Sequence, residues 1–190
     1  SGPGFGGSCF KKDILNLVYL SDYFGLPEVA NFWESVVLFN KWHQHRISKL
    51  VVKKLFGSIS EKKISILGFA FKANTNDTRE SAAIQICKDL IEEGAQLFIH
   101  DPKVDPKQIS SELGIDPINK IKNKFEGGWS FTKDIYESFS GSDACLILTE
   151  WSEYSKIEWD KASKMMRMPA WVFDARSVTD PNKVLKENLK

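Results

Sequence analysis

The 190-residue sequence has little cysteine and no long apolar run. Its three cysteines, Cys9, Cys87 and Cys145, are odd in number and lack Cys-x-x-Cys spacing. A disulfide framework is therefore not expected, and a reducing compartment such as the cytoplasm is. The apolar runs are far shorter than the roughly 18–20 residues of a membrane-spanning helix, so no membrane partner is expected.

The sequence also lacks an excess of charge of either sign. Twenty-six Lys and Arg residues oppose 25 Asp and Glu residues, for a net charge of +1. Because nucleic acids and anionic membrane surfaces select strongly basic proteins, neither is an expected partner. The hydrophobic fraction of 42% and the charged fraction of 27% are those of an ordinary globular protein, with one medium domain or two small ones.

The first third of the chain is predicted to be helical after a glycine-rich opening at residues 1–9. Apolar residues recur at helical spacing from Lys11 to Gly25, and Pro27 suits the first turn of a second helix. That second helix runs uninterrupted from Glu28 to Phe56. It is too long to be buried in so small a domain, which predicts a connector or an oligomer interface. A chain that opens on a loop is also expected to be part of a longer protein.

The remainder alternates between strand and helix patterns. Short apolar runs predict four strands, at residues 64–69, 97–99, 144–148 and 171–173, and helical periodicity predicts helices at 81–93, 134–139 and 160–168. A polar stretch with one short helix precedes Gly128. Strands separated by helices predict an α/β fold, in which a long central helix precedes a parallel sheet with helices on both faces. Ligands of such sheets bind at the carboxyl ends of the strands.

Two glycine-containing segments resemble phosphate-binding loops only in part. Gly2, Gly4 and Gly7 match Gly-x-Gly-x-x-Gly, but no strand precedes them, so the match is not a dinucleotide fingerprint. They still allow close approach of backbone to a ligand. The segment 68–72 follows the first predicted strand with one glycine, which disfavours a dinucleotide. A helix N-terminus together with Lys72 could hold a phosphate or a sugar hydroxyl there.

Cys9 is the sharpest chemical candidate. It lies between the glycine-rich loop and a helix, where the helix dipole and the neighbouring Lys11 and Lys12 favour a thiolate. Asp13 follows one helical turn later, where its carboxylate could act as a base or orient water. The alternative is that Cys9, like most cysteines, is a small buried apolar residue.

The other cysteines and the histidines are predicted to be structural. Cys87 and Cys145 lie among apolar residues and are expected in the core. His43 and His45 fall on different faces of a helix, so no metal site is expected. His100, at a strand end, is expected to cap or pack.

Two arginines follow predicted strands. Arg79 lies in the Asp-Thr-Arg-Glu-Ser segment before a helix, where it could clamp an anion or remain a solvated charge. In the second reading Asp77 or Ser81 simply caps the helix. Arg176 lies at the carboxyl end of the last strand, a position that favours function, although a single arginine is usually a surface residue.

Four motifs together resemble the family of UDP-glucose 6-dehydrogenases, within the wider UDP-glucose/GDP-mannose dehydrogenase family. They are FGGSCF-x-KD at 5–13, GFAFK-x-x-T-x-DTRES at 68–81, ILTEW at 147–151 and PA-x-VFD-x-R at 169–176. The resemblance implies an oxidoreductase with an N-terminal NAD-binding domain that is absent from this chain. It also implies a catalytic-cysteine loop and central helical dimerisation region at 1–60 and a Rossmann-like UDP-binding domain at 61–190.

The resemblance also implies residue roles. Cys9 matches the nucleophile that captures the C6 aldehyde of UDP-glucose, through a thiohemiacetal and a thioester, on the way to UDP-glucuronate. Asp13 matches an acid that assists water or proton movement. Substrate contacts are implied for Gly4, Phe5, Gly6, Phe71, Lys72 and Arg176. Contacts to the cofactor NAD are implied for Lys12 and Arg79, and no metal is implied.

Three positions depart from the family pattern, namely Lys11, Ala175 and Ser177. The last two flank Arg176 and put the detail of its contacts in question. Two other readings stay open: a related dehydrogenase acting on GDP-mannose or a UDP-N-acetylated sugar, and a non-catalytic nucleotide-binding and dimerisation module.

Overall fold

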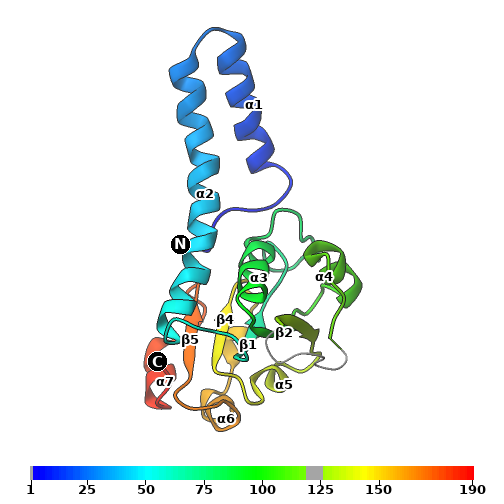
Figure 1. The fold of residues 1–190 in the computed structure, drawn as a ribbon, viewed down its shortest axis with the longest axis vertical. Helices are drawn as coiled ribbons and strands as arrows, with labels where there is room; N and C mark the ends of the chain where they lie inside the picture. Colours follow the sequence, from blue (N-terminus) through cyan, green and yellow to red (C-terminus); the bar gives the residue numbers. More distant parts are fainter. Residues whose placement is uncertain (1, 119–125) are drawn as a thin grey trace.

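The fold was analysed in a computed structural model, which describes residues 2–118 and 126–190. A long helical hairpin projects from a sheet domain (Figure 1). Its arms are α1 (Phe10–Tyr23) and α2 (Pro27–Lys54), joined by a turn in which Gly25 adopts a φ of +71°. At 28 residues, α2 is about 42 Å long, so only its C-terminal part can pack on the domain.

The sheet has five parallel strands in the order β3-β2-β1-β4-β5. They are β1 (Lys63–Leu67), β2 (Gln96–His100), β3 (Gly128–Phe131), β4 (Ala144–Ile147) and β5 (Trp171–Asp174). The strand order reverses between β1 and β4, which makes their carboxyl ends the topological switch point where such sheets bind ligands. The predicted α/β class with a parallel sheet is confirmed.

Helices connect the strands and cover the sheet. They are α3 (Ala82–Glu92), α4 (Pro106–Leu113), α5 (Ile135–Phe139), the 3-10 turn η1 (Tyr154–Lys156), α6 (Trp159–Met165) and α7 (Pro181–Lys186). α3 packs on α4, and α5 packs on α6. Because parallel crossovers are right-handed and the strand order reverses, the two pairs lie on opposite faces. The expectation of helices on both faces is therefore met.

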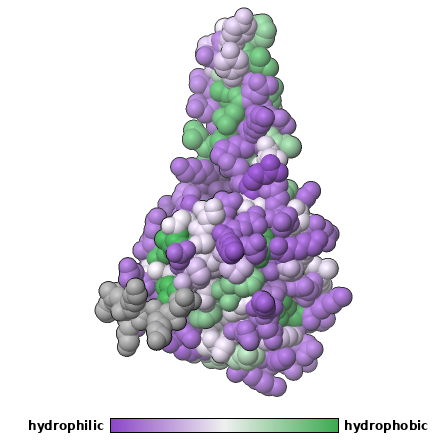
Figure 2. All heavy atoms as spheres, turned by 90° about the vertical axis from the view of Figure 1, so that its right-hand side faces the viewer, coloured by the Kyte–Doolittle hydropathy of each residue, from purple (hydrophilic) through white to green (hydrophobic). Residues whose placement is uncertain are grey.

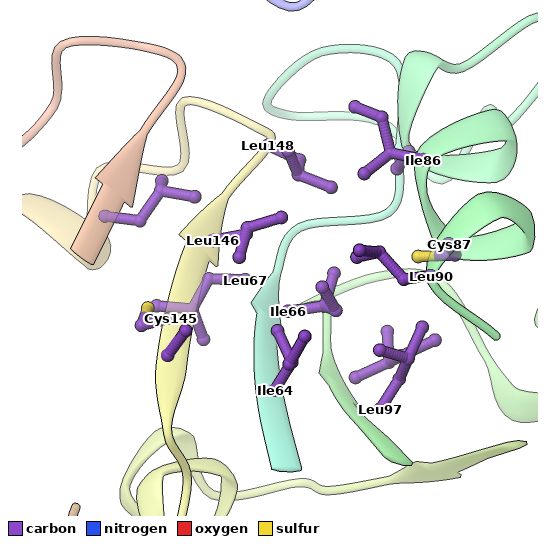
Figure 3. Close-up of a cluster of buried hydrophobic side chains, with 14 of the residues drawn as sticks. Ile64, Ile66, Leu67, Ile86, Cys87, Leu90, Leu97, Cys145, Leu146 and Leu148 are labelled. Carbon is purple, nitrogen blue, oxygen red and sulfur yellow. The ribbon is translucent and has the colours of Figure 1, made fainter. Parts of the chain in front are cut away.

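The core lies between the sheet and its helices (Figure 3). Ile64, Ile66 and Leu146 are fully buried, as are Cys87 on α3 and Cys145 on β4. Burial raises the pKa of both thiols, since the thiolate would lose its hydration. The prediction that these two cysteines belong to the core is confirmed.

Two elements differ from the predictions. β3 begins at Gly128, where the polar stretch ends, in residues for which no strand was predicted, and α7 was not expected at all. β3 is an edge strand of four residues that starts at a glycine, so it has little apolar pattern to detect. β1 ends two residues before the predicted end, because Gly68 turns with a φ of +93° against Thr149. Residues 119–125 of the polar stretch lie outside the described residues.

The hairpin joins the domain through a polar cluster between α2 and α3. His45 Nδ1 lies 2.8 Å from a carboxylate oxygen of Asp89, to which the Ser48 hydroxyl also donates. Gln85 donates to the other oxygen of Asp89 at 2.7 Å. Above this junction many large apolar side chains of the hairpin are exposed (Figure 2), among them Tyr23, Phe24, Phe32, Leu38, Phe39 and Trp42. None of the helices within 2–118 and 126–190 is long and apolar enough to span a bilayer.

Candidate functional site

The candidate site forms where the glycine-rich loop, residues 2–9, passes the carboxyl ends of β1, β4 and β5. The loop lies between α2 and the segment that follows β1 (Figure 1). It thereby brings the N-terminal motif to the sheet's switch point, although more than 50 residues separate the two in sequence. The sequence-predicted residues Phe5, Phe71, Arg79 and Arg176 fall in this region.

The backbone after β1 is held by one buried carboxylate. Asp101, 4% exposed, accepts hydrogen bonds from the amides of Phe69 at 2.7 Å and Ala70 at 3.0 Å. Trp151 Nε1 donates to the same carboxylate at 3.2 Å. Because a buried carboxylate must be satisfied by donors, these bonds fix the start of the 69–72 segment against the strand ends. Sequence reasoning gave Asp101 no such role; its only signal was its place directly after a buried strand.

Arg176 is braced by the backbone at the switch point. Its Nε donates to the Leu148 carbonyl at 2.8 Å, and its Nη2 donates to the Phe71 carbonyl at 3.1 Å. Nε also lies 3.3 Å from a carboxylate oxygen of Glu150, and the Arg176 side chain is only 18% exposed. The guanidinium is thus a largely buried, fixed cation, unlike a solvated surface arginine. This arrangement does not fit a solvated surface arginine, and the role of Arg176 in substrate binding stays a prediction.

The glycine-rich loop packs against the 69–81 segment at distances that exclude side chains. The amide of Gly7 donates to the Arg79 carbonyl at 2.8 Å. A Cβ on Gly6 would lie 2.2 Å from the Glu80 carbonyl oxygen, and one on Gly7, whose φ is +86°, would lie 2.9 Å from the Phe71 ring. The glycines therefore allow close backbone contact with the 69–81 segment, whereas the expected close approach to a ligand stays a prediction.

Cys9 is exposed and occupies the N-cap of α1. The Ser8 hydroxyl oxygen lies 3.6 Å from its sulfur. Lys11, two residues on, forms a 2.8 Å ion pair with Glu80, so the nucleophile candidate is tied to the DTRES segment from a second side. The alternative of Cys9 as a buried apolar residue does not fit its exposure.

Arg79 lies next to this loop and is paired with Asp77. Arg79 Nε donates to Oδ1 at 3.0 Å, and Nη2 donates to Oδ2 at 2.7 Å. The hydrogen bonds from Arg79 hold the pKa of the Asp77 carboxyl below its usual value. The Arg79 side chain is 66% exposed, and its pKa is raised, chiefly by the hydrogen bonds to Asp77 and the charge of that carboxylate. Ser81, not Asp77, caps α3, by accepting from the amide of Ala83.

Asp13, Lys12 and Lys72 are exposed side chains around this region. The amide of Asp13 donates to the Cys9 carbonyl at 2.8 Å, as helical spacing predicts. In the described part of the chain, no hydrogen bond joins the Asp13 carboxylate to the thiol. Lys72 Nζ lies 5.3 Å from the centre of the Phe71 ring.

One contact of the loop was missed by sequence reasoning. Asn40 on α2 pairs with the backbone of Phe5 through both ends of its amide, at 2.9 and 3.0 Å. His43, one turn along α2, donates from Nε2 to the Gly2 carbonyl at 3.0 Å. No group of three or more metal-ligating side chains occurs among residues 2–118 and 126–190.

Comparisons with a family model and with known proteins indicate the same family. Residues 65–181 match the model of the UDP-glucose/GDP-mannose dehydrogenase family, UDP binding domain. The chain is 44% identical over 177 residues to UDP-glucose 6-dehydrogenase of Drosophila melanogaster, covering 93% of this chain and 37% of that protein. It is 40% identical over 198 residues to UDP-glucose 6-dehydrogenase 2 of Oryza sativa subsp. japonica, covering 95% and 39%.

A solved structure agrees with the fold. A UDP-glucose dehydrogenase from Pyrobaculum islandicum superposes with a TM-score of 0.74 and 25% identity, over all of this chain and 37% of that one. The chain thus spans well under half the length of the relatives that it matches. The match covers the larger part of the chain, including the strands that form the switch point. The chain therefore belongs to the UDP-glucose/GDP-mannose dehydrogenase family, with the UDP-binding domain of that family at residues 65–181.

Proposed function

We propose that this chain supplies the nucleophile and most of the nucleotide-sugar site of an NAD-dependent UDP-glucose 6-dehydrogenase. The observation that carries the proposal is the junction between the Cys9 loop and the switch point. Gly7 bonds to the backbone of Arg79, and Lys11 pairs with Glu80, so an exposed thiol sits beside the strand ends where ligands of such sheets bind. In this proposal residues 1–60 carry the nucleophile loop and the self-association surface, and residues 61–190 bind UDP.

The substrate side of the site consists of one fixed cation, one exposed cation and the glycine-rich backbone. Arg176 is held by two carbonyls and Lys72 lies exposed beside Phe71, so both can balance the charge of a diphosphate. In this proposal the glycine-rich loop contacts the sugar of the substrate through Gly4, Phe5 and Gly6. The names of the relatives, UDP-glucose 6-dehydrogenase, support UDP-glucose over GDP-mannose and over UDP-N-acetylated sugars.

The described residues could contact only part of an NAD molecule. Lys12 and Arg79 are exposed cations around Cys9, which suits the phosphates of a dinucleotide. No Gly-x-Gly-x-x-Gly loop follows a strand in the described chain, so a complete dinucleotide site is not formed here. Two NAD molecules, bound one after the other, would each accept one of the two hydrides that the oxidation releases. Of the remaining chemistry, this chain contributes the covalent step at Cys9 and the proton transfer at Asp13.

Cys9 performs the covalent step in this proposal. Its sulfur adds to the C6 aldehyde, forming a C–S bond, and the carbonyl oxygen gains a proton to give a thiohemiacetal. Loss of a hydride and a proton from that adduct leaves a thioester. Water then adds to the thioester carbonyl, the C–S bond breaks, and UDP-glucuronate leaves with Cys9 restored as the thiol. Asp13, one turn from Cys9 on α1, would accept the proton of the attacking water.

The hairpin gives the second part of the proposal. Its exposed apolar side chains would be covered by a second copy of the chain, as a homodimer or a larger homo-oligomer. Closed two-fold symmetry lets the same patch serve both copies.

The decisive experiment uses the full-length protein that contains these residues. NADH formation should be observed with UDP-glucose and should be much faster than with GDP-mannose or UDP-N-acetylmannosamine. The Cys9→Ala variant should form no UDP-glucuronate, whereas Cys87→Ala, which changes a buried thiol, should remain active. A wild-type protein that oxidises GDP-mannose faster would contradict the substrate assignment. A fully active Cys9→Ala variant would contradict the mechanism.

A further inference from the structure

We infer that Asn40 is a positioning residue, whose side-chain amide sets the path of the loop that leads to Cys9. The part of this inference that concerns the ligand rests on the proposed function, while the part that concerns the loop does not. Asn40 lies on α2, in the helical hairpin, and outside the four motifs that carry the family resemblance.

Both polar atoms of the Asn40 side-chain amide bond to the loop. Its Oδ1 accepts from the Phe5 amide at 2.9 Å, and its Nδ2 donates to the Phe5 carbonyl at 3.0 Å. The amide thus pairs with one residue of backbone as a neighbouring strand would. A donor and an acceptor on adjacent atoms are required, so a carboxylate or an aliphatic side chain of similar size cannot make both bonds.

The loop depends on such outside contacts, because it has few of its own. Four of its residues from 2 to 7 are glycines, which lose more conformational freedom on ordering than other residues. The described contacts hold it at three points. His43 bonds to Gly2, Asn40 bonds to Phe5, and the Arg79 carbonyl accepts from Gly7. Asn40 and His43 are three residues apart, hence on the same face of α2.

The Asn40 contact extends towards the nucleophile candidate. The ring of Phe5 meets the ring of Phe10 edge to face, with 4.7 Å between their centres. Phe10 is the first residue of α1 and follows Cys9 directly. Holding Phe5 therefore also holds the start of α1, and with it the backbone that carries the thiol. Gly4 lies so close to Asn40 that a Cβ there would meet Oδ1 at 2.7 Å, so the loop and the amide are fitted to each other.

The test compares three variants of this chain. Asn40→Leu removes both bonds at nearly constant size, and Asn40→Asp keeps the acceptor but replaces the donor with a second oxygen facing the Phe5 carbonyl. Lys41→Leu is the matched control, because it adds the same side chain at the next position of α2, where the side chain is exposed. Amide hydrogen exchange and the NMR signals of Gly4, Gly6 and Gly7 report on the loop, and amides of β1 report on the domain.

In Asn40→Leu, exchange at Phe5 and Gly7 should accelerate about five- to tenfold, the usual effect of losing one hydrogen bond. The glycine signals should move, while β1 exchange and the unfolding midpoint should stay as in Lys41→Leu. Asn40→Asp should keep Phe5 exchange closer to wild type but still move the glycine signals. Unchanged loop signals in Asn40→Leu would overturn the inference, and so would exchange that accelerates equally in β1.

UDP titration separates this inference from the proposed function. If the wild-type chain binds UDP, Asn40→Leu should weaken that binding about five- to tenfold at unchanged thermal stability. Binding that stays within twofold of wild type would overturn the role of Asn40 in positioning the ligand loop. If the wild-type chain does not bind UDP at all, the proposed function fails, while the exchange data still decide whether Asn40 sets the loop.

Discussion

Arg79 and Asp77 form a two-pronged ion pair at the edge of the Cys9 loop, with both carboxylate oxygens of Asp77 engaged. The same arginine offers its carbonyl to Gly7. Arg79 thus has two separate contacts. Its backbone orders the glycine-rich loop, and its side chain keeps a cation exposed beside that loop. Asp77 determines where that cation points.

The first prediction concerns Asp77→Asn in the full-length protein. The substitution removes the charge that orients Arg79, so binding of the phosphate-bearing cofactor should weaken. We expect the KM for NAD to rise about three- to tenfold, with kcat for UDP-glucose oxidation within about twofold of wild type. Steady-state kinetics with varied NAD measures both.

The matched control is Asp116→Asn, which changes a carboxylate just beyond the C-terminal end of α4 that accepts a hydrogen bond from Ser110. It should leave the KM for NAD unchanged. A selective rise in the KM for UDP-glucose in Asp77→Asn would instead place Arg79 on the substrate.

The second prediction ranks the three cysteines by reactivity. Cys9 is exposed, whereas Cys87 and Cys145 are fully buried and their thiol pKa values are raised by burial. A buried thiol reacts only when the structure opens, so iodoacetamide near pH 7.5 should label Cys9 at least about a hundredfold faster. Peptide mapping by mass spectrometry gives the three rates.

Denaturant supplies the internal control for the cysteine ranking. In concentrated urea all three cysteines should react at similar rates, because burial is lost. Faster labelling of Cys87 or Cys145 than of Cys9 in the folded chain would contradict the assignment of the nucleophile.

Much of this arrangement follows from sequence pattern, and the rest does not for physical reasons. The buried strands β1 and β4 and the periodic helix α3 could be predicted, because continuous apolar runs and 3.6-residue periodicity are local signals. β3 could not be predicted, because a four-residue edge strand is formed by pairing with its neighbour and needs no apolar pattern of its own. Asn40 and Asp101 act through contacts to backbone 35 and about 30 residues away, and such contacts leave no trace in the neighbouring sequence.

The third prediction concerns stability below neutral pH. Burial lowers the pKa of His100, whose ring is bonded to the Tyr154 hydroxyl at 3.1 Å. The folded state therefore prefers the neutral ring, and the unfolded state binds the proton more readily. The contribution of the neutral His100 ring to the free energy of unfolding is fully present above the unfolded pKa of about 6.5, and it is lost as the pH falls below that value. Urea unfolding at pH 7.5, 6.0 and 5.0 should show the free energy of unfolding declining.

His100→Gln isolates this effect. The variant should be less stable at pH 7.5, because a buried contact is lost, but its stability should decline less between pH 7.5 and 5.0. The neighbouring Glu153, whose pKa is raised by burial, acts in the opposite direction, and its carboxylate lies 3.7 Å from His100 Nε2. Because removing His100 would change the titration of Glu153, both proteins are compared in a Glu153→Gln background. Parallel pH profiles for the two proteins would show that His100 does not titrate between the folded and unfolded states.

The fourth prediction concerns self-association through the hairpin. Phe39 and Trp42 are stacked 5.2 Å apart on α2 and are 65% and 53% exposed. Aromatic side chains of this kind dominate many interfaces, so Phe39→Ser with Trp42→Ser should weaken association by more than about tenfold. Light scattering at tens of micromolar should show a dimer or larger oligomer for wild type and a shift towards monomer for the variant.

Phe56→Ser is the matched control for the hairpin. Phe56 is 78% exposed but lies beyond the end of α2, beside the sheet domain. Its substitution should leave the oligomeric state unchanged. A wild-type chain that remains monomeric at these concentrations would contradict the proposed interface.

The last prediction concerns what residues 1–190 can do alone. The five strands and their covering helices are complete, so the sheet domain should fold and keep Phe71, Lys72 and Arg176 in place. Calorimetry should therefore detect weak binding of UDP, about millimolar, and weaker binding in Lys72→Ala. Oxidation requires a nicotinamide held against the sugar carbon, and loss of such positioning costs on the order of 7–11 kcal/mol of barrier lowering. Because the proposed function gives this chain only Lys12 and Arg79 as contacts to the dinucleotide, the chain alone should produce no measurable NADH from UDP-glucose. NADH production by the purified chain would contradict the division of the protein into a cofactor part and a UDP part. Tighter binding of NAD than of UDP would show that the switch point of this sheet holds the cofactor instead.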